Sequence, residues 1–172
     1  MDQMKKETIK EIIEGIAMGA IVSSMLLMSI RINAAGANGR ILEEYAAYCE
    51  EAGRDYGICP ELLEAIMEEE SGGDPGAVGG AGEIGLMQIY PKYHRERAER
   101  LGADRLEDPE WNVLVAADYL SELFQRYGDV GTVLMAYNGV KDAKERGARG
   151  DYTDYAKRVM ERAAQLEREN GK

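Results

Sequence analysis

Three consecutive glutamates, Glu68 to Glu70, end an apolar run and are followed by glycines in the stretch LLEAIMEEESGG (Leu62 to Gly73). Each residue of a helix turns by about 100°, so Ile66 falls about 40° and Glu70 about 80° from the first leucine. The first glutamate points away from this apolar arc, and the second lies at its edge. Of the three, only Glu70 is predicted to face the core side, at the mouth of a glycine-rich loop.

A carboxylate that ends an apolar face loses hydration, which favours its neutral form. The negative charges of the neighbouring glutamates act in the same direction. A carboxylic acid that stays protonated near neutral pH can serve as a general acid. The alternative is that the end of the helix frays and Glu70 turns to water, where it has no special chemistry.

The elements that must position Glu70 are helices. From Arg40, apolar residues recur every three and four positions. A second helix is predicted from Pro60, a favoured first-turn residue, to about Glu70. Residues 71–85 form a loop with seven glycines, and a short helix is predicted after Pro91.

The second half of the chain also predicts helices. Asp108 and Pro109 are a cap and a first-turn residue before an apolar stripe. Residues 130–137 form a short helix that ends at Asn138, and the last helix carries Tyr155 on its apolar face. No stretch alternates with a period of two residues, so we expect an all-α domain.

Residues 1–37 differ from the rest of the chain. Gly15 to Ile30 carries no charge, and three lysines precede it. This apolar length is slightly above that of a signal peptide and just below that of a membrane-spanning helix. The residues AGA at 35–37 offer a cleavage site. We expect a signal peptide, or else a membrane anchor, before an exported domain (residues 38–172) at the cell surface, outside the cell or in the periplasm. A buried core helix is the alternative.

Composition narrows the class of protein. A chain of 172 residues suits one domain, which we expect to be a monomer. The net charge of -11 argues against a nucleic-acid partner. The two cysteines, Cys49 and Cys59, are either a disulfide of an exported protein or two free thiols. With one histidine, His94, they cannot supply a usual zinc site, so no metal is expected.

Four motifs carry a resemblance. ESGGDPGAVGGAGEIGLMQIYP (Glu70 to Pro91) resembles the signature of lytic transglycosylase SLT domains, a lysozyme-like family related to goose-type lysozyme. The family pattern E-S-x-x-x-P-x-A-x-S-x-x-G-A-x-G-L-M-Q lies over it without a gap. DPEWNVLVAADYL (Asp108 to Leu120), AYNG (Ala136 to Gly139) and YAKRV (Tyr155 to Val159) resemble the later family motifs, in the same order.

The resemblance implies a reaction. We expect a lysozyme-like domain that cleaves the β-1,4 bond between N-acetylmuramic acid and N-acetylglucosamine in peptidoglycan, without a cofactor. One glutamate protonates the leaving oxygen. As a base, it then helps the muramoyl 6-hydroxyl to close a 1,6-anhydro ring, so that no water is consumed. A hydrolytic glycosidase would need a second carboxylate about 5–9 Å away.

The resemblance also implies site residues. Glu70 would be the general acid and base, and Tyr155 would hydrogen-bond its carboxyl group. Gly85 would let the backbone approach the sugar, and the Gln88 amide would bind an N-acetyl or hydroxyl group. The full set expected to bind substrate is Ser71, Gly85, Leu86, Met87, Gln88, Tyr137, Asn138 and Tyr155. Without the resemblance, several of these would be interpreted as core or cap residues.

Two positions depart from the family pattern. Gly79 stands where the family has serine, and Glu83 stands where it has alanine. The first change removes an expected hydrogen bond, and the second places a charge beside the loop. Glu83 could raise the pKa of Glu70 or supply the second carboxylate of a hydrolytic muramidase. A catalytically silent peptidoglycan-binding or scaffold protein is the remaining alternative.

Overall fold

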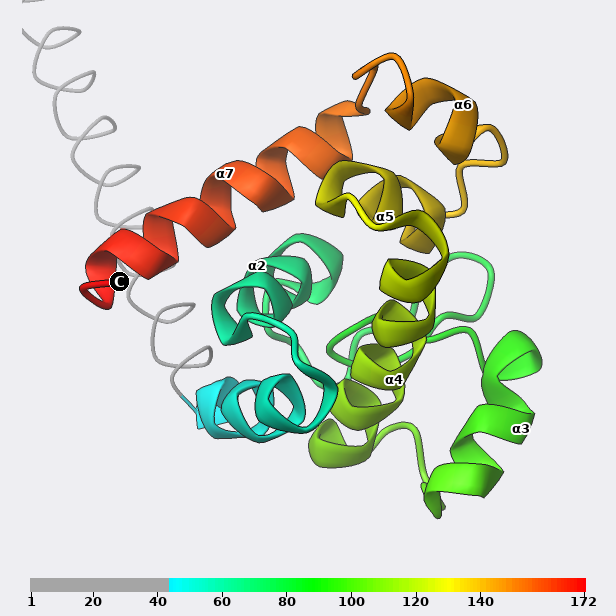
Figure 1. Cartoon of the computed structure of the whole chain (residues 1–172). Helices are drawn as coiled ribbons and strands as arrows, with labels where there is room; N and C mark the ends of the chain where they lie inside the picture. Colours follow the sequence, from blue (N-terminus) through cyan, green and yellow to red (C-terminus); the bar gives the residue numbers. More distant parts are fainter. Residues whose placement is uncertain (1–43) are drawn as a thin grey trace, which may run out of the picture. The chain divides into compact units, whose positions relative to one another are not determined.

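The computed structural model describes residues 44–172, and the predicted leader, residues 1–37, lies outside the described residues. A helix at residues 44–56 comes first. The helices after it are α2 (Pro60–Ser71), α3 (Pro91–Leu101), α4 (Pro109–Tyr127), α5 (Val130–Tyr137), α6 (Ala143–Gly147) and α7 (Asp154–Glu169) (Figure 1). Residues 44–172 contain isolated β-bridges but no strand, which confirms the all-α prediction. In this part of the chain, no helix is long and apolar enough to cross a membrane.

The predicted helix starts are present. Proline occupies the first turn of α2, α3 and α4. At the start of α4, the Asp108 side chain accepts a hydrogen bond from the Glu110 backbone N–H at 3.1 Å, so the expected cap is confirmed. Helix α6 was not predicted from the sequence. Its five residues, AKERG, include three charges and are too short to show an apolar period.

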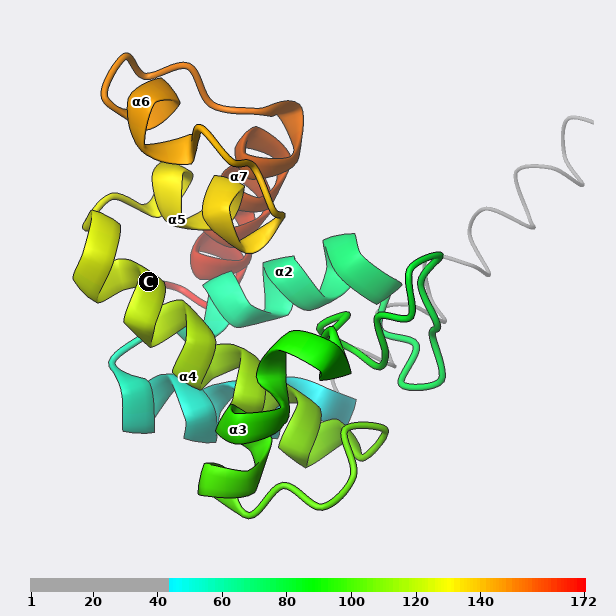
Figure 2. The same cartoon turned by 90° about the vertical axis from the view of Figure 1, so that its right-hand side faces the viewer.

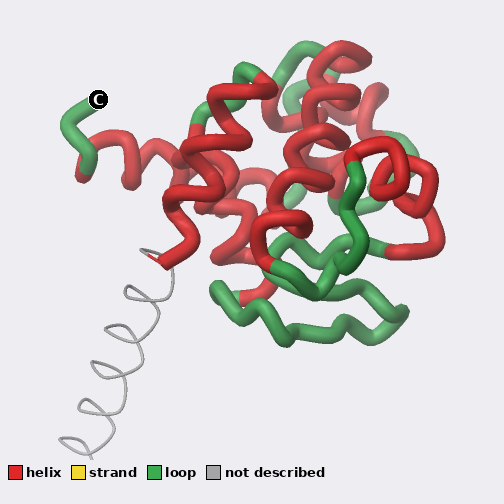
Figure 3. The backbone as a smooth tube through the Cα atoms, turned by 90° about the horizontal axis from the view of Figure 1, so that it is seen from below, coloured by secondary structure: helices red, strands yellow, loops and turns green. Residues whose placement is uncertain are grey.

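Helix α2 is the central element of the fold. Figures 1 and 2 both show it between α7 and the helix at residues 44–56. Its side chains Leu63, Ile66 and Met67 are fully buried. Helix α2 packs against α7, which in turn packs against α5. The loop that follows α2 extends beyond its C-terminal end (Figure 2), and much of the non-helical chain lies on one side of the helices (Figure 3).

A buried asparagine on α4 holds the signature loop against the helices. The Asn112 side chain accepts a hydrogen bond from the Met87 backbone N–H at 2.7 Å. It donates to the carbonyl oxygens of Ile84 (3.0 Å) and Leu106 (2.7 Å). Because Asn112 has no solvent exposure, its bonds to Met87 and Leu106 satisfy backbone groups inside the protein. The Ile84 carbonyl oxygen also accepts from the Ile89 backbone N–H at 3.0 Å. Asn112 belongs to the motif DPEWN, but no role for it was predicted from the sequence.

The geometry around Gly85 corrects its predicted role. A Cβ atom at this position would lie 2.5 Å from Nδ2 of Asn112, and its φ of 74° also favours glycine. The absent side chain therefore makes room for the asparagine. Gly85 is buried, so its close approach is to α4 rather than to a sugar.

The disulfide alternative is wrong for this structure, because both cysteines are free thiols. Cys49 is buried in the core. The Cys59 thiol donates to carboxylate oxygens of Glu61 (3.0 Å) and Glu167 (3.2 Å). Burial raises the pKa of the Cys59 thiol to about 11. Its sulfur is therefore protonated at neutral pH and is directed at these two carboxylates.

We expect Asn112→Ala to lower the free energy of unfolding by about 2 kcal/mol or more, because it leaves the Met87 N–H and the Leu106 carbonyl group without their partner at roughly 1–3 kcal/mol each. Urea unfolding measures this. Asn138→Ala is the matched control, since Asn138 is exposed and its loss should cost no more than about 0.5 kcal/mol. Equal losses for the two variants would contradict the role of Asn112.

Candidate active site

Two of the three glutamates at the end of α2 form ion pairs with α7. Glu68 pairs with Arg162. Glu69 accepts from Nε of Arg158 at 2.9 Å. Among the described residues, Glu70 is in no ion pair within 4.0 Å. The charges of Glu68 and Glu69 are thus paired with arginines, whereas the Glu70 carboxylate makes a different contact.

That contact is a hydrogen bond across the same helix pair. The hydroxyl group of Tyr155 on α7 donates to Oε1 of Glu70 at 2.5 Å. Burial raises the pKa of Glu70, the hydrogen bond from Tyr155 lowers it, and the negative charges of Glu69 and Glu83 raise it further. The net direction is upward. Glu70 therefore holds its proton to a higher pH than a solvated carboxylic acid does.

Glu70 opens into a pocket of about 480 Å³. Its lining comes from the signature loop, the start of α3, the middle of α4 and the end of α5. The lining residues are Glu70, Glu83, Gln88, Ile89, Tyr90, Tyr93, His94, Tyr119, Ala136, Tyr137, Asn138 and Gly139. Four of the predicted site residues are among them: Glu70, Gln88, Tyr137 and Asn138. The structure thus brings together residues from four separate segments around one carboxyl group.

The remaining predicted residues, Ser71, Gly85, Leu86, Met87 and Tyr155, do not line this pocket. Leu86 and Met87 have no solvent exposure, so their side chains belong to the core. The Ser71 hydroxyl donates to the Leu86 carbonyl oxygen at 2.8 Å and ties the end of α2 to the loop. The Tyr137 hydroxyl donates to the Met87 carbonyl oxygen at 2.8 Å. These residues shape the pocket by holding the loop in place.

The contacts of Gln88 narrow its predicted role. Its Nε2 group donates to the carbonyl oxygens of Ala77 (3.2 Å) and Gly85 (2.9 Å). Both amide hydrogens are therefore used inside the loop, and Oε1 remains as an acceptor. The backbone φ of Gln88 is 47°, a positive value that non-glycine residues rarely adopt. The loop is thus held in a strained conformation at a pocket residue.

The two departures from the family pattern meet at one point in space. A Cβ atom at Gly79 would lie 2.4 Å from Oε2 of Glu83 and 2.7 Å from Oε1 of Gln88. The same Glu83 oxygen accepts from the Ala81 backbone N–H at 3.0 Å. The carboxylate of Glu83 thus fills the space that a side chain at position 79 would need. The residues at positions 79 and 83 therefore compete for the same space, so we expect a side chain at one position to affect the other.

Sequence reasoning missed the aromatic wall of the pocket. Tyr90 lies at the end of the signature, Tyr93 and His94 follow it, and Tyr119 lies on α4. The His94 ring meets the Tyr119 ring edge-on at 4.7 Å, and burial lowers the pKa of His94 to about 4. Two tyrosines three residues apart at a helix start were the available signal, since such residues share one face.

The comparison with known proteins agrees with this geometry. The family model described as "Transglycosylase SLT domain" matches residues 47–159, which include all the pocket residues. This chain belongs to the transglycosylase SLT domain family.

The SLT relatives include proteins of bacteria and of a phage. The transglycosylase of Enterobacteria phage PRD1 is 37% identical over 98 residues, which are 57% of this chain and 36% of the phage protein. Invasion protein IagB of Salmonella typhimurium is 34% identical over 123 residues, 67% of this chain and 74% of that protein. An endo-type membrane-bound lytic murein transglycosylase A of Klebsiella pneumoniae is 40% identical over 81 residues, 43% of this chain and 40% of that protein.

The SLT fold is also found in a solved structure. An inactive mutant of lytic transglycosylase Slt from Pseudomonas aeruginosa matches with a TM-score of 0.62 and 21% identity. The match covers 73% of this chain and 24% of that protein. This likeness supports the lysozyme-like all-α architecture of the SLT domain.

We expect two substitutions to move the pKa of Glu70 in opposite directions. Glu83→Gln removes a like charge and should lower it. Tyr155→Phe removes a hydrogen bond to the ionised form and should raise it. NMR titration of the carboxyl carbons would measure both shifts. Shifts of the same sign would contradict the assigned contacts.

A double-mutant cycle tests the coupling of positions 79 and 83. Gly79→Ser alone must displace the Glu83 carboxylate, whereas in the Glu83→Ala background the space is free. We expect the two changes together to destabilise the fold by at least about 0.5 kcal/mol less than the sum of the single changes. Urea unfolding of the four proteins gives this coupling. Additive effects would show that the two positions are independent.

Proposed function

We propose that this SLT domain is a peptidoglycan lytic transglycosylase with Glu70 as its general acid and base. The observation that carries the proposal is the 2.5 Å hydrogen bond from Tyr155 to a half-buried Glu70 at the wall of an open pocket. Membership of the family and the relatives named as transglycosylases support it.

In the proposed first step, Glu70 donates its proton to the oxygen of the β-1,4 bond as that bond breaks. Burial favours the protonated acid that this step consumes. The resulting carboxylate accepts the hydrogen bond from Tyr155, which favours the ionised form. Because the two effects oppose each other, both protonation states of Glu70 are accessible within one catalytic cycle.

In the second step, the Glu70 carboxylate takes the proton of the muramoyl 6-hydroxyl, whose oxygen bonds to C1 and closes the 1,6-anhydro ring. The acid is regenerated, and no water enters. We assign the free Oε1 of Gln88 to an N–H or O–H group of the sugar. Asn138, which is exposed at the pocket rim, is assigned a polar contact to the strand.

A hydrolytic muramidase is the second candidate function, and one observation favours it. Glu83 lines the same pocket as Glu70 and could activate water as the second carboxylate of a glycosidase. A silent binding protein has less support, since binding alone does not require a carboxylic acid with a raised pKa.

Glu70→Gln should lower the rate of peptidoglycan cleavage by roughly 10²–10⁴-fold, the contribution typical of a general acid. Glu69→Gln is the matched control, because this neighbouring carboxylate is paired with Arg158 on the surface, and it should cost little activity. Release of soluble fragments from purified peptidoglycan measures both. Equal activity of Glu70→Gln and the parent would end the assignment.

The Glu70→Gln variant also has an expected stability. The pKa of Glu70 is raised in the folded state. Its contribution to the free energy of unfolding is therefore fully present below the pKa that the group has in the unfolded chain. This contribution is lost as the pH rises through the pKa that the group has in the folded protein. Glutamine stays neutral, so the variant should unfold no earlier than the parent at pH 7. Comparing the stability of the two proteins shows whether a loss of activity comes from the missing acid or from unfolding of the variant.

The products distinguish the two reactions. Mass spectrometry of the fragments should find 1,6-anhydro ends for the transglycosylase. Reducing ends would instead establish the muramidase. We further propose that residues 1–37 direct export to the cell envelope, which cell fractionation and N-terminal sequencing of the mature protein would test.

A further inference from the structure

A pair of tyrosines beside the catalytic pocket has no role in the proposed reaction. Tyr90 is the residue before α3, and Tyr93 lies in its first turn. Their rings stack with centroids 4.9 Å apart and planes at 27°. Tyr93 is 73% exposed, and only Val78 matches it among the exposed large apolar side chains of the described residues. The ring of Tyr93 thus packs on Tyr90, and Nζ of Lys92 lies 5.6 Å from its centroid, while most of the side chain remains open to a ligand.

Tyr93 stands between two hollows. Both tyrosines line the pocket that contains Glu70. Tyr93 also lines a second, larger hollow of about 990 Å³, formed by α3 and the residues that connect it to α4. A chain that extends from one hollow into the other would therefore pass beside Tyr93.

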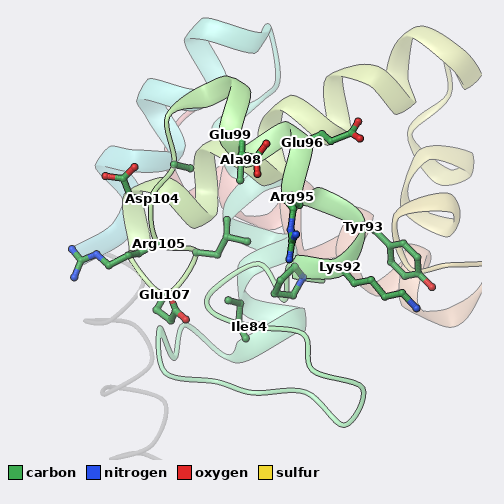
Figure 4. A pocket seen from close by; sticks show the side chains of 13 residues that line it. Ile84, Lys92, Tyr93, Arg95, Glu96, Ala98, Glu99, Asp104, Arg105 and Glu107 are labelled. Carbon is green, nitrogen blue, oxygen red and sulfur yellow. The ribbon is translucent and has the colours of Figure 1, made fainter.

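The second hollow indicates what kind of ligand fits. Figure 4 shows Lys92 and Tyr93 at one end, Asp104 and Arg105 at the other, and Arg95 between them. Within residues 44–172, neither Lys92 nor Arg95 forms an ion pair within 4.0 Å. A protein partner with an apolar surface is a poor match for this hollow, because charges of both signs surround the exposed ring. The acidic chain, with a net charge of -11, does not suit an anionic membrane.

We propose that Tyr90 and Tyr93 form a carbohydrate subsite in which the exposed ring of Tyr93 stacks on a pyranose of a β-1,4-linked N-acetylated amino-sugar strand. A pyranose has an apolar face of C–H groups and a rim of hydroxyl and amide groups. The apolar face of the pyranose covers the Tyr93 ring, while its hydroxyl and amide groups reach the polar side chains around that ring. The identification of the strand as peptidoglycan rests on the proposed function.

The test uses binding, so that it is independent of catalysis. Isothermal titration of the Glu70→Gln protein with the β-1,4-linked hexasaccharide of N-acetylglucosamine gives the reference Kd. Tyr93→Ala in this background should raise Kd roughly three- to tenfold, the value of one aromatic contact. Tyr93→Phe keeps the ring and should bind like the reference. Val78→Ala, which removes a 74% exposed side chain that lines neither hollow, should also have no effect.

Several outcomes would overturn the subsite. The first is an unchanged Kd for Tyr93→Ala, and the second is no measurable binding by the reference protein. Equal losses for Tyr93→Phe and Tyr93→Ala would assign the effect to the hydroxyl group and not to the stacked ring. Because Tyr93 is mostly exposed, the variants should keep the thermal unfolding midpoint of the reference.

A kinetic measurement on the active protein completes the test. Tyr93→Ala should raise KM for peptidoglycan and leave kcat unchanged, because the stacked sugar is held equally in the ground and transition states. A fall in kcat with unchanged KM would contradict a binding role. If the hexasaccharide binds as expected but no peptidoglycan is cleaved, the subsite stands and the proposed function fails.

Discussion

The hydrogen bond between Tyr155 and Glu70 is the contact on which the site depends, and it exists because α7 packs along α2. The ion pairs of Glu68 and Glu69 with arginines of α7 lie beside it. They pair two of the three adjacent glutamates with cations of α7. The third carboxylate is then held by a neutral donor, so it is oriented without being forced to ionise.

The signature loop shows how a motif can serve catalysis indirectly. Most of its characteristic residues face the protein: Leu86 and Met87 are buried, and Gly85 makes room for Asn112. Of the four residues Gly85 to Gln88, only Gln88 reaches the pocket, and its backbone has a positive φ. Burial and hydrogen bonding of the loop supply the stability that holds this strained residue beside the carboxyl group of Glu70.

The residues at positions 79 and 83 affect both the packing and the electrostatics of the pocket. Glu83 fills the volume left by Gly79 and adds a negative charge that raises the pKa of Glu70. The pocket lining contains no lysine or arginine, so no cation in the wall offsets this charge. The site therefore favours a protonated Glu70 and an uncharged sugar over an anionic ligand.

The sequence by itself determined what depends on local geometry. The period of 3.6 residues identified the helices and placed Glu70 on the inner face of α2, while proline and aspartate marked helix starts. The sequence also identified the family, because the residues of the signature are contiguous in the chain. It could not detect α6, whose five residues span little more than one helical turn and cannot show a repeat.

Only the tertiary structure decided which distant residues meet. Tyr155 reaches Glu70 across 85 positions because α7 crosses the end of α2, and no local pattern encodes that crossing. The free thiols, the Asn112 bonds and the tyrosine wall likewise follow from how the helices pack. A motif names the residues that a site needs, whereas the packing decides which of them face the pocket and which hold the loop behind it.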